Sequence, residues 1–439
     1  MLKVTSAGRV TRLNCTLRGH KDAISGLQVF YVPSSLAARS EEHEIQLLSP
    51  TLVSSDESGW IYWWDLTSRR PLGVWKAHDG NVLTIKQLGL TWDRGAPVFD
   101  DAWFGKLLSH GKDGELKIWD IFEFSLDATH TFKPASVLSR RIYTEGGRAA
   151  QWPTPPVAFQ MPINVMNFSN VDIRNGILLA PGTQDSAKLD IYCIDAEDKA
   201  LKRLCKAVDP LEIAEKNDMD LNVQVPPENS SRGLGIVMKL VWLGDEKFAV
   251  GFESGHVVTF ALKDDEVDIL DFDSQHYPNP ILALHYDHYN DKLISTSSAD
   301  KIVIHSQDEH RTFKLKHKGV ADVKTMENMV GMVTWDGYSR FYSYDNDSIL
   351  KFQFKLHKVV PSIAATNSTV DIAENVGDLQ QRASVLAFSH NQAFSRSTLV
   401  HTNGMGKNIV RRRDEMNLVS KFLFIGYKDG RIAIYTINE

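Results

Sequence analysis

His78, Ser109 and Asp113 bring together the three residue types of a hydrolytic triad. A triad needs an exposed nucleophile with an oxyanion site beside it, and no nucleophile, paired-carboxylate or metal constellation stands out in this chain. With Trp119, these residues follow an order that instead predicts a buried hydrogen-bonded network. Asp113 fixes the His78 ring, which reaches Ser109 and the Trp119 indole N–H. We refer to this set as the blade network.

An earlier copy of the same pattern occurs at His20, Ser54 and Trp64. Ser58 occupies the position that Asp113 has in the later copy. Because Ser58 has no carboxylate to fix the histidine ring, we expect the earlier network to be weaker.

Two further stretches suggest binding sites but have simpler interpretations. His285, Asp287 and His288 lie close together, but a metal site needs a third or fourth convergent ligand that the sequence does not identify. A strand end followed by a turn explains this stretch. Residues 404–408 (GMGKN) lack the first glycine of a phosphate loop, and Asn408 replaces its Ser or Thr. The sequence therefore predicts no metal and no cofactor.

The chain contains one dense basic cluster, formed by Lys407, Arg411, Arg412 and Arg413. These side chains could contact an acidic partner, a phosphate or a nucleic acid. A solvated loop is the alternative.

The stretch around the later network, LLSHGKDGELKIWD (residues 107–120), reads as a strand, an Asp-Gly turn, a second strand and a Trp-Asp pair. A step of six residues links the turn residue Asp113 to Trp119, and related steps recur along the chain. Four of them have the same length and a glycine after the turn residue, one has Lys301 in place of the glycine, and one is a residue longer. The recurrences run from Ser58 to Trp64, Ser254 to Phe260, Asp336 to Tyr342, Asp429 to Tyr435, Asp300 to Ser306 and Asp185 to Tyr192.

Seven such units predict an all-β fold, a single seven-bladed β-propeller of the WD40 type. Each four-stranded blade buries its faces against its neighbours, and closing the ring removes most exposed sheet edges. Residues 12–17 read as a strand, and the third strand of the last blade ends near the C-terminus. We therefore expect the N-terminal strand to complete the last blade and close the ring.

The chain of 439 residues exceeds the roughly 300 that seven blades need. We therefore expect one propeller over residues 1–439 with long insertions. Residues 163–168 read as the inner strand of the irregular third blade. The insertions are predicted near 33–49, 91–104, 139–162, 209–232, 367–382 and 395–417.

The composition excludes several classes of protein. A formal charge of −6 gives no overall nucleic-acid signal, and no run of 18 apolar residues predicts a membrane span. The three cysteines, Cys15, Cys193 and Cys205, read as free thiols in a reducing compartment. We expect no signal peptide, no membrane contact and no direct nucleic-acid binding.

At a finer level the chain resembles one WD40 family, the fungal ASTRA-associated protein 1 family, which is similar to the metazoan guanine-nucleotide-binding β-subunit-like protein. The resemblance is carried by residues 17–30 (LRGHKDAISGLQVF), 51–80, 107–121 and 425–435 (IGYKDGRIAIY). It implies a non-enzymatic scaffold of the ASTRA assembly, a monomeric subunit of a hetero-complex in the nucleus and cytoplasm. The implied partners are RuvB-like AAA+ ATPases, the triple-T cochaperone and a large phosphatidylinositol-3-kinase-like protein, whose maturation it would support, with a link to chromatin.

Two other functions stay open at this point. A substrate receptor of a cullin-type ubiquitin ligase is a common use of propellers, but such receptors often carry Arg two residues after a Trp-Asp pair. Thr67 and Phe122 occupy these positions here. An enzyme housed in a propeller is not excluded by fold alone.

Overall fold

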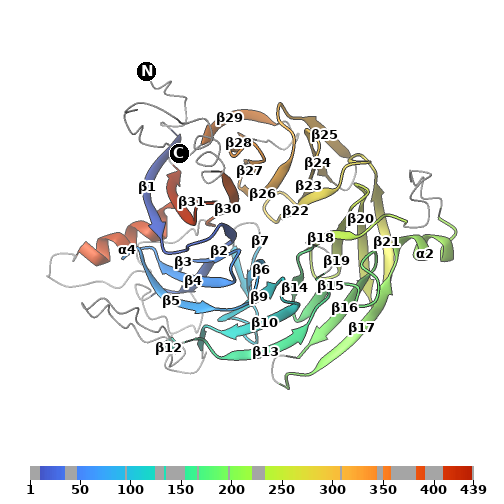
Figure 1. The fold of residues 1–439 in the computed structure, drawn as a ribbon, viewed down its shortest axis with the longest axis horizontal. Helices are drawn as coiled ribbons and strands as arrows, with labels where there is room; N and C mark the ends of the chain where they lie inside the picture. Colours follow the sequence, from blue (N-terminus) through green and yellow to red (C-terminus); the bar gives the residue numbers. More distant parts are fainter. Residues whose placement is uncertain are drawn as a thin grey trace, which may run out of the picture.

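The computed structural model describes residues 10–34, 47–93, 96–123, 133–134, 154–165, 168–195, 198–219, 233–306, 309–343, 350–356, 382–390 and 409–437. These residues form seven four-stranded antiparallel sheets arranged around a central axis (Figure 1). The predicted all-β fold, a seven-bladed propeller, is therefore confirmed. Among the described residues, no helix combines the length and the apolar character needed to cross a membrane.

In each blade the strands are given from the axis outward. Blade 1 contains β2 (Ile24–Pro33), β3 (Leu48–Asp56), β4 (Trp60–Asp65) and β5 (Arg70–Lys76), and blade 2 contains β6 (Val82–Gln87), β9 (Lys106–Gly111), β10 (Glu115–Asp120) and β13 (Val157–Pro162). Blade 3 contains β14 (Asp172–Arg174), β15 (Ile177–Pro181), β16 (Leu189–Ile194) and β17 (Leu201–Val208), and blade 4 contains β18 (Val237–Trp242), β19 (Lys247–Phe252), β20 (Val257–Lys263) and β21 (Glu266–Asp273). Blade 5 contains β22 (Ile281–Asp287), β23 (Lys292–Ser297), β24 (Lys301–His305) and β25 (His310–Lys314), and blade 6 contains β26 (Val320–Met326), β27 (Met329–Thr334), β28 (Ser339–Ser343) and β29 (Lys351–Leu356).

Blade 7 joins the two ends of the chain, as the sequence predicts. Its strands β30 (Ala383–Phe388), β31 (Lys421–Tyr427) and β32 (Arg431–Ile437) come from the C-terminal part, and β1 (Thr11–Arg18) adds the outer strand. Thr11 pairs with Ile437 and Arg18 pairs with Arg431, so β1 covers the full length of β32. In Figure 1, β1 lies beside the C-terminal strands of this blade. The edge of β32 is thereby paired within the molecule.

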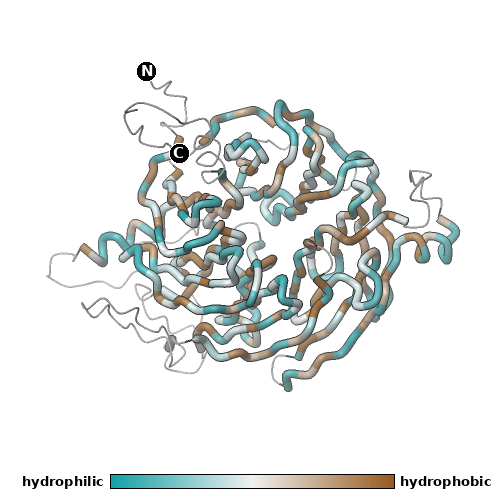
Figure 2. Tube along the Cα trace, viewed as in Figure 1, coloured by the Kyte–Doolittle hydropathy of each residue, from teal (hydrophilic) through white to brown (hydrophobic). Residues whose placement is uncertain are grey.

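The core is distributed around the ring. Figure 2 shows hydrophobic residues in every blade rather than in one central mass. Each large buried cluster draws on neighbouring blades: one joins blades 7, 1 and 2, and another joins blades 3 and 4. Apolar side chains between adjacent sheets therefore hold the ring together.

The predicted inner strand of blade 3 is wrong. That strand is β14 (Asp172–Arg174), and residues 163–165 form no strand. The predicted insertion at 139–162 also ends too late, because β13 (Val157–Pro162) is the outer strand of blade 2 and pairs with β10. The only proline within β13 is its last residue, Pro162, and the outer edge of a blade can accommodate a residue without an N–H.

Two of the remaining predicted insertions contain short elements where they are described, whereas the bounds of the insertion at 33–49 overlap the end of β2 and the start of β3. β7 (Leu90–Asp93) pairs with β8 (Ala96–Phe99) in antiparallel orientation, and α2 (Pro210–Lys216) begins at the N-cap Asp209. A small pair, β11 (Phe122–Glu123) and β12 (Lys133–Pro134), lies in the connection between β10 and β13 of blade 2, outside the predicted insertions. Residues 35–46, 220–232, 367–381 and 395–408, which the predictions include among the insertions, lie outside the described residues.

The end of the last predicted insertion is a helix, α4 (Ile409–Val419), rather than a loop. In Figure 1, α4 lies at the rim of the ring beside the strands of blade 1.

Candidate functional site

The structure brings the four residues of the later blade network together in blade 2. His78 Nε2 lies 2.8 Å from Ser109 Oγ, and its Nδ1 lies 3.0 Å from Asp113 Oδ1. The Trp119 indole N–H donates to Ser109 Oγ at 2.7 Å. His78 follows the outer strand of blade 1, so the network also ties blade 1 to blade 2.

The earlier network, in blade 1, has the same geometry but a different carboxylate. His20 Nε2 lies 2.7 Å from Ser54 Oγ, and Trp64 Nε1 donates to the same oxygen at 2.8 Å. Asp56 Oδ2 lies 2.7 Å from His20 Nδ1. We expected a weaker network in blade 1 because Ser58 has no carboxylate. The contact of Asp56 with His20 does not agree with that expectation.

Sequence reasoning missed Asp56 because it counted from the turn. Ser58 is half-buried, and its hydroxyl donates to Asp22 rather than contacting the histidine. Asp56 stands two residues after Ser54 on the same strand, so the two side chains share one face. That period of two was the signal that could have identified it.

Neither network can serve as a hydrolytic triad. Ser54 and Ser109 are both 0% exposed. Each hydroxyl already contacts a histidine and a tryptophan, so a substrate has no access to it.

We expect a third histidine of this region, His110, to make folding sensitive to acid. It is fully buried, and neither ring nitrogen has a hydrogen-bond partner among the described residues. Burial, with the nearby His78 ring, lowers the pKa of His110 from 6.5 to about 4. The unfolded chain therefore binds a proton that the folded chain rejects, so this contribution to stability is complete above pH 6.5 and is lost as the pH falls toward 4.

We therefore expect that lowering the pH reduces the free energy of unfolding less in His110→Leu than in the unmodified chain. Between about pH 7.5 and about pH 5 the difference should be about 2 kcal/mol, measured by urea unfolding. His317→Leu is the control, because its ring is half-exposed. An equal loss in the unmodified chain and His110→Leu would contradict this assignment.

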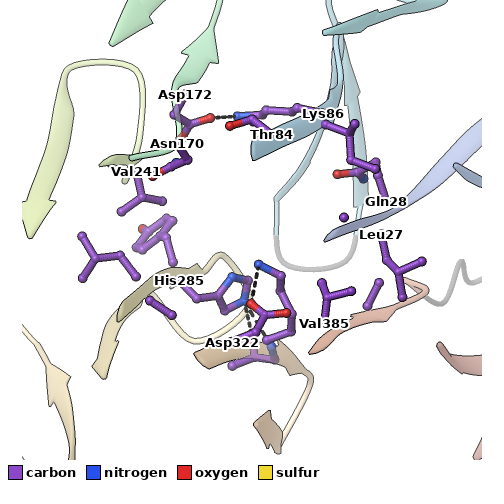
Figure 3. A pocket seen from close by; sticks show the side chains of 18 of the residues that line it. Leu27, Gln28, Thr84, Lys86, Asn170, Asp172, Val241, His285, Asp322 and Val385 are labelled. Atoms are coloured by element: carbon purple, nitrogen blue, oxygen red, sulfur yellow. Dashed lines mark hydrogen bonds and ion pairs between the residues drawn. The ribbon is translucent and has the colours of Figure 1, made fainter. Parts of the chain in front are cut away.

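A cavity of about 490 Å³ follows the propeller axis and is lined by the inner strands of all seven blades (Figure 3). Lys86 forms an ion pair with Asp172, and Lys324 Nζ lies 3.5 Å from Asp322 Oδ1. Burial lowers the pKa of Lys239, although the Asp322 carboxylate opposes this effect. The charges of the channel are therefore largely balanced by one another, as a polar channel within a ring requires.

The His-rich stretch lies at this channel but its side chains have separate partners. His285 Nε2 lies 2.9 Å from Thr325 Oγ1. Asp287 accepts hydrogen bonds from the backbone of Tyr289 and the side chain of Asn290. Asp287 ends β22 and a turn follows, so the structure agrees with a strand end followed by a turn.

The three arginines of the predicted basic cluster lie on α4, but only some of them are exposed. Arg411 Nε lies 3.1 Å from Glu415 Oε1 within the helix, whereas Arg412 and Arg413 are exposed. Lys407 lies outside the described residues.

Helix α4 is attached to blade 1 along one side, and its opposite side is exposed. The Thr67 hydroxyl donates to Asp414 and accepts from Asn417 Nδ2 at 2.8 Å, and Leu418 is buried. Three large apolar side chains of α4 are exposed, as are Arg412 and Arg413. We call these five residues the α4 face. Its members are Ile409, Arg412, Arg413, Met416 and Val419. Exposed apolar side chains combined with arginine are typical of protein-binding surfaces.

The seven blades, their closure by the N-terminal strand and the buried networks of blades 1 and 2 define a β-propeller of the WD40 type. The family model of ASTRA-associated protein 1 matches residues 13–435. The chain belongs to this family.

The ASTRA-associated protein 1 of Komagataella phaffii is 32% identical over 446 residues, with 96% of each chain covered. That of Meyerozyma guilliermondii is 28% identical, with 96% of this chain and 98% of the relative covered. Among solved structures, Chaetomium thermophilum Raptor matches with a TM-score of 0.53 at 14% identity, covering 98% of this chain and 30% of Raptor. This last similarity concerns the fold alone.

Proposed function

We propose that this protein is a non-enzymatic scaffold subunit of the ASTRA assembly. The observation that carries the proposal is the match, over 96% of the chain, to a relative named for its association with ASTRA. The buried serines of the blade networks offer no nucleophile to a substrate, which is consistent with a role in binding.

In this proposal the partners are RuvB-like AAA+ ATPases, triple-T cochaperone subunits and a large phosphatidylinositol-3-kinase-like protein. The protein supports the maturation and stability of that kinase-like protein and links the assembly to chromatin. It acts as a single copy within a hetero-complex, in the nucleus and the cytoplasm.

The α4 face is the surface that we propose contacts a partner. Arg412 and Arg413 supply positive charge, and Ile409, Met416 and Val419 are each at least 60% exposed. A partner surface with carboxylates around an apolar centre would complement this combination.

The alternative of a cullin-ligase receptor is less compatible with the structure. Thr67, two residues after the first Trp-Asp pair, is buried and bonded to Asp414 and Asn417 of α4. Phe122, at the corresponding position of blade 2, is 3% exposed. Neither side chain is available to an adaptor.

Charge reversal on the α4 face should weaken assembly without affecting the fold. In Arg412→Glu/Arg413→Glu, the two positive charges that face the carboxylates of the partner become repulsive. We expect recovery of the ATPases, the triple-T subunits and the kinase-like protein to fall about ten-fold or more. The measurement is affinity purification of tagged full-length protein at near-physiological salt, followed by quantitative mass spectrometry.

The matched control is Lys206→Glu/Lys247→Glu, which reverses two exposed charges on blades 3 and 4. Recovery with the control should equal that of the unmodified chain. If the unmodified chain recovers none of these partners, the proposed function is wrong. If both double variants retain full recovery, another surface makes the contact.

A further inference from the structure

Blade 5 has a histidine where blades 1 and 2 have the tryptophan of the blade network. His305 pairs with Leu293, as Trp64 pairs with Leu52 and Trp119 pairs with Leu107. His305 Nε2 lies 2.7 Å from Ser295 Oγ, the same contact that the indole N–H makes in the other two blades. The repeat spacing assigned Ser306 to the tryptophan position of blade 5, but the structure assigns the preceding residue, His305, to it.

An imidazole has a second nitrogen that an indole lacks, and here that atom is not hydrogen-bonded. His305 is 6% exposed, and its Nδ1 has no hydrogen-bond partner among the described residues. Asp273 Oδ2 lies 3.4 Å away, but it too is buried without a hydrogen bond. Two buried electron-rich atoms that face each other without a shared hydrogen bond are costly unless a cation lies near them.

His310 and Asp271 lie beside this pair. The rings of His305 and His310 have centroids 5.0 Å apart. His310 Nε2 lies 3.2 Å from Asp271, while its Nδ1 is buried without a partner among the described residues. Asp271, His305 and His310 each offer one ligand atom, and these atoms all lie within 4.8 Å of one another.

Hydrogen bonds around the cluster already orient His305. Ser295 Oγ also lies 2.9 Å from His276 Nε2, and His276 Nδ1 lies 2.9 Å from Ser297 Oγ. A chain in which His305 Nε2–H donates to Ser295 and Ser295 donates to His276 leaves the lone pair of His305 Nδ1 directed at the cluster. Such second contacts hold ligand histidines in the correct tautomer at metal sites.

We propose that Asp271, His305 and His310 bind a divalent transition-metal ion, with Zn²⁺ as the best fit. Two imidazoles and a carboxylate suit Zn²⁺, whereas Ca²⁺ and Mg²⁺ prefer oxygen ligands. Asp273 lies next to the site and is positioned to add charge or a fourth ligand. Because β21 belongs to blade 4 whereas β24 and β25 belong to blade 5, the bound ion clamps two blades together.

The test uses the full-length chain after removal of metals by chelation. Zn²⁺ should bind with one ion per chain in isothermal titration calorimetry, and Co²⁺ should give visible d–d absorption typical of a nitrogen-containing site. His310→Ala should weaken binding about 100-fold or more, and Zn²⁺ should no longer raise the melting temperature. Asp271→Asn keeps the shape of the side chain but removes its charge, so it tests the site if His310→Ala fails to fold.

The control is His317→Ala, which removes a half-exposed histidine that is not part of the cluster. It should bind Zn²⁺ as the unmodified chain does. Absence of binding in the unmodified chain, or equal affinity in His310→Ala and Asp271→Asn, overturns the proposal. In that case a shared proton between His305 and Asp273 accounts for the pair.

Discussion

Removal of residues 1–18 should abolish cooperative folding or lower the melting temperature by about 10 °C or more. The deletion removes β1, which pairs with β32 from Thr11 to Arg18. It removes the burial of Leu17, which is 3% exposed and contributes about 2 kcal/mol by itself. It also leaves the edge of β32 unpaired, and an open edge can pair with another molecule.

Thermal unfolding and size-exclusion chromatography would measure both effects, the loss of stability and the formation of aggregates. Deletion of residues 1–9 is the matched control, because it stops before β1. That shorter deletion should melt within a few degrees of the full chain, about 3 °C or less. Equal melting temperatures for the two deletions would show that the ring does not depend on this strand.

Asp56→Ala should cost about 3 kcal/mol of stability, whereas Ser58→Ala should cost about 0.5 kcal/mol or less. Asp56 is 1% exposed and accepts hydrogen bonds from the backbone N–H groups of Ser58 and Trp60 as well as contacting His20. Its removal leaves these three buried or half-buried groups without their partner. The side chain of Ser58 contributes only a hydroxyl, which donates to Asp22.

Urea unfolding of the two variants at neutral pH makes this comparison directly. Asp56→Asn should fall between them, because an amide oxygen can still accept a hydrogen bond but carries no charge. If Ser58→Ala were as damaging as Asp56→Ala, the turn rather than the strand end would provide the essential group.

The sequence by itself predicted the seven blades because their signals are local. The step from Asp113 to Trp119 lies within one strand-turn-strand unit, and its recurrence needs no knowledge of the remaining chain. The contacts of His78 with Ser109 and Asp113 were also predictable, because Ser109 and Asp113 belong to this unit and His78 lies in the connection that leads to it from blade 1. Closure by β1 was also predictable. The C-terminal part of the chain supplies only three strands of the last blade, so the N-terminal strand is needed as the fourth.

The strands that flank long insertions were not predictable in this way. In blade 3 the choice between residues 163–168 and β14 (Asp172–Arg174) depends on which segment faces the channel. Likewise, β13 (Val157–Pro162) reaches blade 2 only after the long segment that follows β12. Its partner is decided by sheet pairing across that distance rather than by local periodicity.

The candidate sites needed the tertiary structure for the same reason. Arg411 and Arg412 are neighbours in the sequence, but docking of α4 on Thr67 leaves Arg412 exposed while Arg411 pairs with Glu415. Asp271 and His305 belong to different blades, and only packing of blade 4 against blade 5 brings them together. Local chemistry therefore determined the repeat and its buried networks, whereas contacts between distant segments decided which remaining polar groups converge.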